Sequence, residues 1–292
     1  MKDGSVLGID VGFSERKNTT CFCLMEWSEK TVRWSFEVAS ADSRERARKI
    51  EVLLAEPRQL FAVAIDGPLT RHLRLVSHYR SAEALLSRGV FQKWGKPGQT
   101  SSPVGQKLHK HATQLANLVL KAAERGNLSV APASHIEPIH QTAITEAFPN
   151  LFLAVLIDEQ HLPVLHRDAS DRYWVYLVES NGLDKLMEFL LPGRKLSTGF
   201  AEIRDHDKRA AVACALTALA VATELAVGVG DPDDGDIFLP PRDLWGWSRS
   251  GESAWAEEAL QANVAALHGK SGASHPNHCK ARVRLHDRYL VP

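Results

Sequence analysis

The chain lacks a net charge, a paired cysteine motif and an apolar segment at its start. Its 35 Lys and Arg residues balance 35 Asp and Glu residues, which excludes the whole-protein basic field of a simple nucleic-acid coat. Its four cysteines include no C-x-x-C pair, so we interpret them as reduced thiols. Because no apolar signal core precedes the first predicted strand, we expect a cytoplasmic protein without a membrane segment.

The chain also has no internal repeat and no low-complexity segment, and its composition is that of a folded protein. Hydrophobic residues make up 44% of the chain and charged residues 24%, so disorder is not expected. With 292 residues, the chain is long enough to bury a sizeable core, either as one large domain or as a domain with an extension.

Two apolar runs of strand length each end on an aspartate. Residues 6–9 lead to Asp10, and residues 60–65 lead to Asp66. A single D-x-G sequence is typical of an aspartate that caps a turn. However, an ionised Asp is rarely buried unless it is paired or holds a metal, and ligands of open α/β sheets lie beyond the carboxyl ends of the strands. The repeated pattern therefore predicts half of a metal site.

The order of the elements between these aspartates predicts the fold. Residues 21–27 and 31–38 are expected to form two strands, and residues 43–55 a helix with Arg46 and Lys49 on a solvated face. A three-strand meander followed by helix and strand is the order of an RNase H-like sheet, in which strand one lies beside strand four. We therefore predict an α/β fold with a mixed five-stranded RNase H-like sheet flanked by helices.

The remaining segments are assigned relative to this sheet. We expect residues 1–240 to form the RNase H-like domain, with a loop and helix insertion around 67–135, and residues 241–292 to form a C-terminal helical extension with a basic tail. A helix is predicted over residues 253–267 within that extension. The tail gathers histidines, a cysteine and basic residues, and their spacing fits no common zinc finger: His275, His278, Cys279 and His286.

The predicted insertion contains a segment that is rich in glycine and proline. Residues 91–105 place Lys93, Trp94 and Lys96 among these breakers, which predicts a long loop before a helix over residues 107–124. Such a loop can be an ordinary surface loop or a substrate-facing flap that mixes basic and aromatic groups. The sequence leaves both interpretations open.

Two further carboxylates follow later in the chain. A short strand-like run meets Glu146 shortly before Pro149, and this Glu is either a solvent-facing residue at a strand end or a third ligand. An acidic segment precedes an alanine-rich stretch over 210–227 that is predicted to be a buried helix. One acidic residue there suits the helix dipole as a cap. Asp207 is our preferred ligand, with Asp205 and His206 as second choices.

In order and spacing, these stretches resemble the "domain of unknown function 429" family of predicted RNase H-fold nucleases. The resemblance covers roughly residues 1–240. The matching pieces are G-I-D-V-G-F-S at 8–14, A-I-D-G-P-L at 64–69, an R-x-x-E-x-x-L-x-x-G pattern at Arg80, Glu83, Leu86 and Gly89, E-A-F-P at 146–149, and H-D-K-R-A-A-V-A-C-A-L-T-A at 206–218. The family's last helix has the pattern H-D-x-x-D-A, and this chain carries Ala210 where the second Asp would fall.

The resemblance implies a metal-dependent nuclease that hydrolyses phosphodiester bonds in nucleic acid. Oxygen ligands suit Mg²⁺ or Mn²⁺, and two such ions about 3.5–4 Å apart activate a water and stabilise the leaving oxygen. The implied metal ligands and catalytic residues are Asp10, Asp66, Glu146 and Asp207. The implied phosphate contacts are Arg80, Lys93, Lys96 and Lys107.

Two other functions are kept as alternatives. Residues 10–14 also fit the D-x-G-x-S hairpin of actin-like and sugar-kinase ATPases, but a second D-x-G-G phosphate loop is absent from the sequence. The other alternative is a catalytically reduced RNase H-like scaffold that binds nucleic acid or protein, and Ala210 favours it. Metal binding distinguishes the nuclease from the scaffold, and nucleotide binding distinguishes the ATPase from both.

Overall fold

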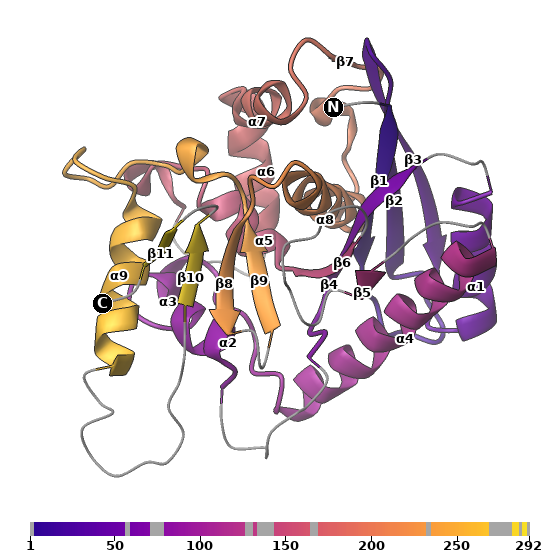
Figure 1. Ribbon diagram of the computed structural model, residues 1–292, viewed down its shortest axis with the longest axis horizontal. Helices are drawn as coiled ribbons and strands as arrows, with labels where there is room; N and C mark the ends of the chain where they lie inside the picture. The colour runs from indigo at the N-terminus through magenta and orange to yellow at the C-terminus, as the bar shows by residue number, and fades with distance from the viewer. Residues whose placement is uncertain are drawn as a thin grey trace.

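A single mixed sheet runs through the computed structural model, which describes residues 3–55, 59–70, 79–125, 131–132, 143–163, 169–231, 235–268, 282–285 and 288–290. Within these residues, 11 strands are ordered β11-β10-β8-β9-β6-β4-β1-β2-β3-β7, with β5 paired to β6 (Figure 1). The strands are β1 Gly4–Asp10, β2 Thr20–Trp27, β3 Thr31–Ala39, β4 Leu60–Asp66, β5 Ala131–Pro132, β6 Ala143–Ala147, β7 Lys195–Leu196, β8 Val227–Asp231, β9 Gly235–Leu239, β10 Arg282–Leu285 and β11 Arg288–Leu290.

Helices flank this sheet (Figure 1). The α-helices are α1 Ser43–Leu53, α2 Ser81–Leu86, α3 Phe91–Trp94, α4 Pro103–Arg125, α5 Pro149–Ala154, α6 Ala169–Glu179, α7 Gly182–Leu190, α8 His206–Ala222 and α9 Trp255–His268, and the short 3₁₀ helices are η2 Glu159–His161, η3 Phe200–Glu202 and η4 Arg242–Leu244. In the described part of the chain, no helix combines the length and the apolar character needed to cross a bilayer. The predicted α/β class is confirmed, and the sheet extends beyond the five predicted strands.

The central strand β1 determines which strand ends meet. It pairs antiparallel with β2 and parallel with β4, and every residue of β1 before Asp10 is buried. A strand covered on both faces has a continuously apolar sequence, which explains the absence of alternation in β1. The parallel pairing brings the carboxyl ends of β1 and β4 to the same edge of the sheet.

Different helices cover the two faces of the sheet at β1. α8 packs on β1, β2 and β4, and Gly8 permits this contact because a Cβ there would lie 2.2 Å from both the Ala211 carbonyl oxygen and the Ala215 nitrogen. α1 and α4 cover the opposite face, where their apolar residues form a cluster with Ile9 and Ile65. Side chains that alternate along β1 and β4 are thus divided between an α8 face and an α1/α4 face.

The described cysteines lie in the core on the α8 face. Cys21 and Cys23 of β2 belong to the same buried cluster as Cys214 of α8, and all three thiols are free. Burial raises the pKa of each thiol, which keeps the group protonated and unreactive. Cys279 lies outside the described residues.

The segment predicted as a long loop over residues 91–105 contains helical structure. α3 lies within it, and α4 begins at Pro103 instead of at Lys107. Proline suits the first turn of a helix because the N–H that it lacks would have no helical partner there. The remaining connection is short, and Thr100 and Ser101 within it are buried.

The predicted alanine-rich helix ends earlier than expected, and a strand that we did not predict follows it. Glu224 has a φ of 61°, and the N–H groups of Glu224 and Leu225 donate to the carbonyl oxygens of Val221 and Ala220. This Schellman arrangement usually has glycine at the left-handed position. Because glutamate occupies it here, the sequence gives no sign of the helix end. β8 begins at Val227 and pairs with β9.

The C-terminal part of the chain packs against the same core. α9, which confirms the helix predicted over residues 253–267, contributes Trp255 and Leu260 to the core cluster that includes α8. Asn263 donates a hydrogen bond to the carbonyl oxygen of Leu85 at 2.7 Å, and β10 pairs with β8. The remaining residues that were considered as zinc ligands, His275, His278 and His286, lie outside the described residues.

Candidate functional site

Asp10 and Asp66 lie at the carboxyl ends of two neighbouring parallel strands. The register pairs Ile9 with Ile65, the residues immediately before them. Both isoleucines belong to the core cluster of the α1/α4 face, so the next side chain along each strand points to the α8 face. The structure thus places these two carboxylates beside each other, as the sequence predicted. Both side chains are partly exposed, which leaves the pair accessible from solvent.

The third carboxylate comes from the first turn of α8. Asp205 is the N-cap of this helix, and its side chain accepts a hydrogen bond from the N–H of Lys208 at 3.0 Å. One of the two acidic residues is therefore the cap, as expected from the helix dipole. Asp207 is the other, and its charge raises the pKa of Asp10, which places its carboxylate within electrostatic reach of the strand ends.

Burial and mutual repulsion make these carboxylates hard to ionise together. Burial raises the pKa of Asp10 well above its ordinary value, and the charges of Asp66, Asp207 and Asp205 raise it further. Burial, then the charge of Glu146, raises the pKa of Asp66 to about 7. The pKa of Asp207 is also raised, by burial and then by Asp205. Such a group is stabilised in its ionised form by a nearby cation.

The oxygen donors suit a hard divalent cation, although their side chains are not gathered into a complete site. Among residues that the structure describes, no three His, Cys, Asp or Glu side chains form a group that could hold a metal ion. Asp10, Asp66 and Asp207 could supply carboxylate oxygens, the ligands that Mg²⁺ and Mn²⁺ prefer. The chemistry of the donors therefore fits the predicted metal.

Glu146 lies at the same edge of the sheet, close enough for its charge to raise the pKa of Asp66, but it is bound by an arginine. The register pairs Asp66 with Ala147 and Ile65 with Glu146, so Glu146 lies on the face opposite to Asp66. Its carboxylate accepts two hydrogen bonds from Arg80, at 2.9 Å from Nη1 and at 2.7 Å from Nη2. Burial raises the pKa of Glu146, and Arg80 opposes that shift.

Arg80 is buried and binds two carboxylates. Its Nε donates to Glu83 Oε1 at 2.8 Å, and the N–H of Thr100 donates to the same oxygen at 3.1 Å. Burial lowers the pKa of Arg80, but Glu146 and Glu83 raise it more, so the guanidinium is permanently charged. The Arg80 and Glu83 of the R-x-x-E pattern therefore form, with Glu146, a buried ion-pair network (the Arg80 network) in which the predicted phosphate contact and one predicted metal ligand bind each other.

The three predicted lysine contacts are exposed and lie in two places. Lys93 belongs to α3, and Lys96 follows it in the connection to α4. Lys107 belongs to the first turns of α4, where its Nζ lies 4.8 Å from the centroid of the Phe13 ring. Since Phe13 is three residues beyond Asp10, only Lys107 of the three is tied by a described contact to the loop that carries the carboxylate.

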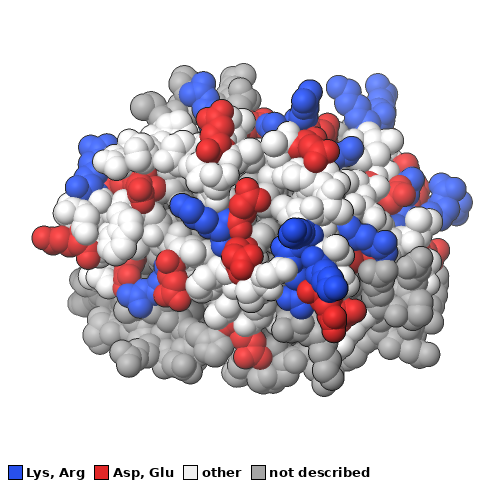
Figure 2. All heavy atoms as spheres, turned by 90° about the horizontal axis from the view of Figure 1, so that it is seen from above, with Lys and Arg blue, Asp and Glu red and all other residues white. Residues whose placement is uncertain are grey.

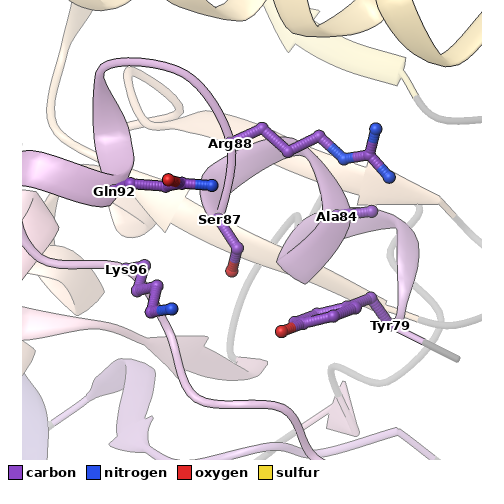
Figure 3. Close-up of a pocket in the computed structure, with 6 residues that line it drawn as sticks. All are labelled: Tyr79, Ala84, Ser87, Arg88, Gln92 and Lys96. Atoms are coloured by element: carbon purple, nitrogen blue, oxygen red, sulfur yellow. The ribbon is translucent and has the colours of Figure 1, made fainter. Parts of the chain in front are cut away.

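Lys96 lines a cavity of about 330 Å³ together with Tyr79, Ala84, Ser87, Arg88 and Gln92. Figure 3 shows the ammonium group of Lys96 and the hydroxyl groups of Tyr79 and Ser87 directed into the same space, while the guanidinium of Arg88 extends away from it. The Ser87 hydroxyl donates to the carbonyl oxygen of Pro97 at 3.3 Å. Polar groups and a larger apolar surface line this cavity together, and it lies beside α2, the helix that follows Arg80 in the chain.

A second ion pair beside α8 was not predicted from the sequence. Asp171 of α6 binds His206 at 3.1 Å and Arg209 at 2.8 Å, and these contacts connect α6 to the first turn of α8. The carboxylate lies in the first turn of α6. Asp171 and His206 are 35 positions apart, and neither segment carries a sequence signal for this pairing.

Arg46 corrects the prediction of a solvated face on the helix over residues 43–55. Its side chain is fully buried, and it donates to the carbonyl oxygen of Gly12, to Thr20 Oγ1 at 2.8 Å and to Gln114 Oε1 at 3.0 Å. The charge pattern of the helix could not reveal this, because the acceptors come from the β1–β2 loop and from α4. Arg46 fixes the loop that follows Asp10.

Charges of both signs are interspersed on the face of the molecule shown in Figure 2, in agreement with the balanced composition. No patch of a single charge sign therefore marks a substrate-binding surface on this face.

Comparisons of the chain with protein-family models, with curated proteins and with solved structures find no match. The functional argument consequently depends on the residues and their geometry.

Proposed function

We propose that this protein is a metal-dependent nuclease with an RNase H-like sheet, and that it belongs to the "domain of unknown function 429" family. The observation that carries the proposal is the adjacency of Asp10 and Asp66 at the carboxyl ends of parallel strands, with the first turn of α8 supplying Asp207. Three carboxylates at one edge of a sheet, with raised pKa values, are typical of a cation site.

The strand order supports the RNase H-like assignment. The segment β3-β2-β1-β4-β6 has β2 antiparallel to both neighbours and β1, β4 and β6 parallel to one another. This is the arrangement expected for an RNase H-like sheet, with the last core helix packed across strands one and four. Here that helix is α8.

The chain's own residues would hold the cation and position the substrate. Asp10, Asp66 and Asp207 would bind Mg²⁺ or Mn²⁺, and the bound ion supplies an activated water and charge stabilisation in phosphodiester hydrolysis. Gly8 allows α8 to pack closely on β1. This close packing limits how far Asp207 can lie from Asp10 and Asp66. The Arg80 network stabilises the adjacent strand end without contributing a ligand.

A catalytically reduced scaffold is the second candidate, and one observation favours it. Both carboxylate oxygens of Glu146 accept hydrogen bonds from Arg80, so this fourth carboxylate is already neutralised within the fold. With Ala210 at the position of the family's second Asp, three carboxylates remain. A site of this kind can bind a cation without supporting turnover.

Calorimetric titration with Mn²⁺ tests the proposal. Wild type should bind the ion, Asp10→Asn and Asp66→Asn should lose at least tenfold in affinity, and the exposed control Asp184→Asn should bind as wild type does. The same preparations are then assayed for Mn²⁺-dependent cleavage of labelled single- and double-stranded DNA and RNA. Binding with cleavage supports the nuclease, and binding without cleavage supports the scaffold.

Two outcomes would overturn the nuclease. If wild type binds no Mn²⁺, the carboxylates are not a metal site. If the protein binds ATP and hydrolyses it but leaves every nucleic acid intact, the actin-like alternative replaces the proposal.

A further inference from the structure

The loop that follows Asp10 presents an aromatic ring to solvent. Phe13 is 39% exposed, and it is three residues from the first carboxylate of the site. A single exposed phenylalanine is common and needs no explanation. The contacts that this ring makes distinguish it from the other exposed apolar side chains.

Two residues of α4 hold the Phe13 ring in place. Lys107 Nζ lies 4.8 Å from the ring centroid, and the imidazole of His111 stacks on the ring with centroids 6.5 Å apart and planes inclined by 23°. Lys107 and His111 are four residues apart and thus lie on the same side of the helix. Both contacts come from α4, and 39% of Phe13 remains exposed beside them.

The backbone beneath the ring is fixed as well. Buried Arg46 donates to the Gly12 carbonyl oxygen and to Thr20 Oγ1, which ties together the two ends of the loop, and its Nη1 lies 3.1 Å from His111 Nδ1. A Cβ on Gly12 would lie 2.0 Å from Thr19 Oγ1, so the loop closes tightly there. The ring is thus held by α4 and its loop by Arg46 of α1, so neither needs to be ordered by a ligand.

We infer that Phe13, on the loop that follows Asp10, is a stacking platform for an unpaired nucleobase, with Lys107 placed to contact the adjoining phosphate. An exposed ring beside an exposed ammonium matches the two parts of a nucleotide, the flat base and the anionic backbone. A base in a duplex is stacked on its neighbours and cannot use such a platform. This inference rests on the proposed function, because it takes nucleic acid as the ligand of the site.

Fluorescence titrations in EDTA test the platform without turnover. The probe is a 12-nucleotide single-stranded DNA that contains 2-aminopurine, and a blunt duplex of the same sequence is the comparison. Phe13→Leu keeps apolar bulk but removes the π face, and it should weaken single-strand binding about 5- to 100-fold. Phe13→Trp should bind at least as tightly as wild type, and duplex binding should not change in either variant.

Matched controls separate stacking from general surface effects. Trp247→Leu removes an exposed aromatic ring (56% exposed) from the loop before α9 and should leave binding unchanged. Lys107→Gln should weaken binding and reduce the slope of log affinity against log salt by about 1, whereas Lys110→Gln, an exposed neighbour on α4, should do neither. Circular dichroism confirms that each variant is folded.

The inference is overturned if wild type binds no single strand, if Phe13→Leu binds as wild type does, or if Phe13→Leu weakens duplex and single strand equally. The proposed function fails by a different measurement. Absence of Mn²⁺ binding and of cleavage, together with Phe13-dependent single-strand binding, would remove the nuclease and retain the platform. Mn²⁺ affinity should be unchanged in Phe13→Leu, because the ring is not a ligand.

Discussion

Two groups of carboxylates lie at the carboxyl edge of the sheet, and they differ in what balances their charge. Glu146 and Glu83 share the buried guanidinium of Arg80. In contrast, Asp10 and Asp66 form no salt bridge with a described residue, and their pKa values are raised. A carboxylate with an internal cation is part of the folded framework, whereas a cluster without one favours an external cation. The same residue type at the same edge therefore indicates structure in one case and ligand binding in the other.

The largest loss of stability is expected from removing a carboxylate that Arg80 neutralises. Glu146→Gln should lower the free energy of unfolding by about 3–5 kcal/mol, because it removes the bidentate partner of a buried guanidinium. Urea denaturation measures this loss. Arg242→Gln is the matched control, since its pair with Glu257 is half exposed and should contribute at most about 1 kcal/mol. Equal losses in the two variants would show that Arg80 does not depend on Glu146.

Asp10 and Asp66, the uncompensated group without an internal cation, should destabilise the folded state when they ionise. In metal-free protein, the folded-state pKa of Asp66 is about 7 against an ordinary value of 3.8, so the folded state holds this proton more tightly than the unfolded state does. Between about pH 4 and pH 7, the free energy of unfolding should be greatest at the acidic end. It should fall by about 2–4 kcal/mol as the pH rises across this range.

Urea midpoints measured in EDTA across this range test the prediction. Asp66→Asn should remove most of the slope and should be more stable than wild type at pH 8. Saturating Mn²⁺ should restore wild-type stability and leave the variant unchanged. A wild-type curve that is flat between pH 4 and pH 7 would contradict the raised pKa.

The packing of α8 on β1 tests the comparison further, because α8 carries Asp207, the third carboxylate of the candidate metal site. Gly8→Ala should lower the free energy of unfolding by about 1–3 kcal/mol through overpacking against backbone atoms of α8, and it should weaken Mn²⁺ binding because α8 must move away from β1. Thermal unfolding and calorimetry measure the two effects. Gly98→Ala, where a Cβ would meet nothing within 4 Å, should change neither.

The smallest effect compares two helix caps. Asp205 caps α8 beside the carboxylates, and Asp42 caps α1 by accepting from the N–H groups of Arg44 and Glu45. Each change to alanine should cost about 1 kcal/mol. At pH 8 without metal, however, the loss in Asp205→Ala should be smaller, because the change also removes a charge that repels Asp10. Equal losses at pH 8 and at pH 5 would exclude that repulsion.

The adjacency of Asp10 and Asp66 could be predicted from local patterns together with the order of the elements between them. Each aspartate ends an apolar run of strand length, and the order of elements between them allows few arrangements. That one acidic residue caps the alanine-rich helix also followed from a local rule, since a cap bonds within its own helix turn, and the structure assigns the cap to Asp205. The apolar runs and the cap are each encoded within a few residues.

The direction of Glu146 could not be predicted in this way. Its strand was recognised, but the face to which a side chain points depends on the register with β4, and a shift of one residue reverses it. The partner of Glu146 is Arg80, 66 residues away, and nothing in either segment identifies the other. Arg46 was misassigned for the same reason, because its acceptors come from two other elements.

The sequence by itself determined the α/β class, the strand ends that carry Asp10 and Asp66, and the acidic start of α8. These depend on hydrophobic period and on helix and turn chemistry, which act over a few residues. Only the tertiary structure decided which carboxylates are neutralised by a buried arginine and which are left to repel one another. That outcome depends on strand register and on contacts between distant segments, and it is these that set the local electrostatic field.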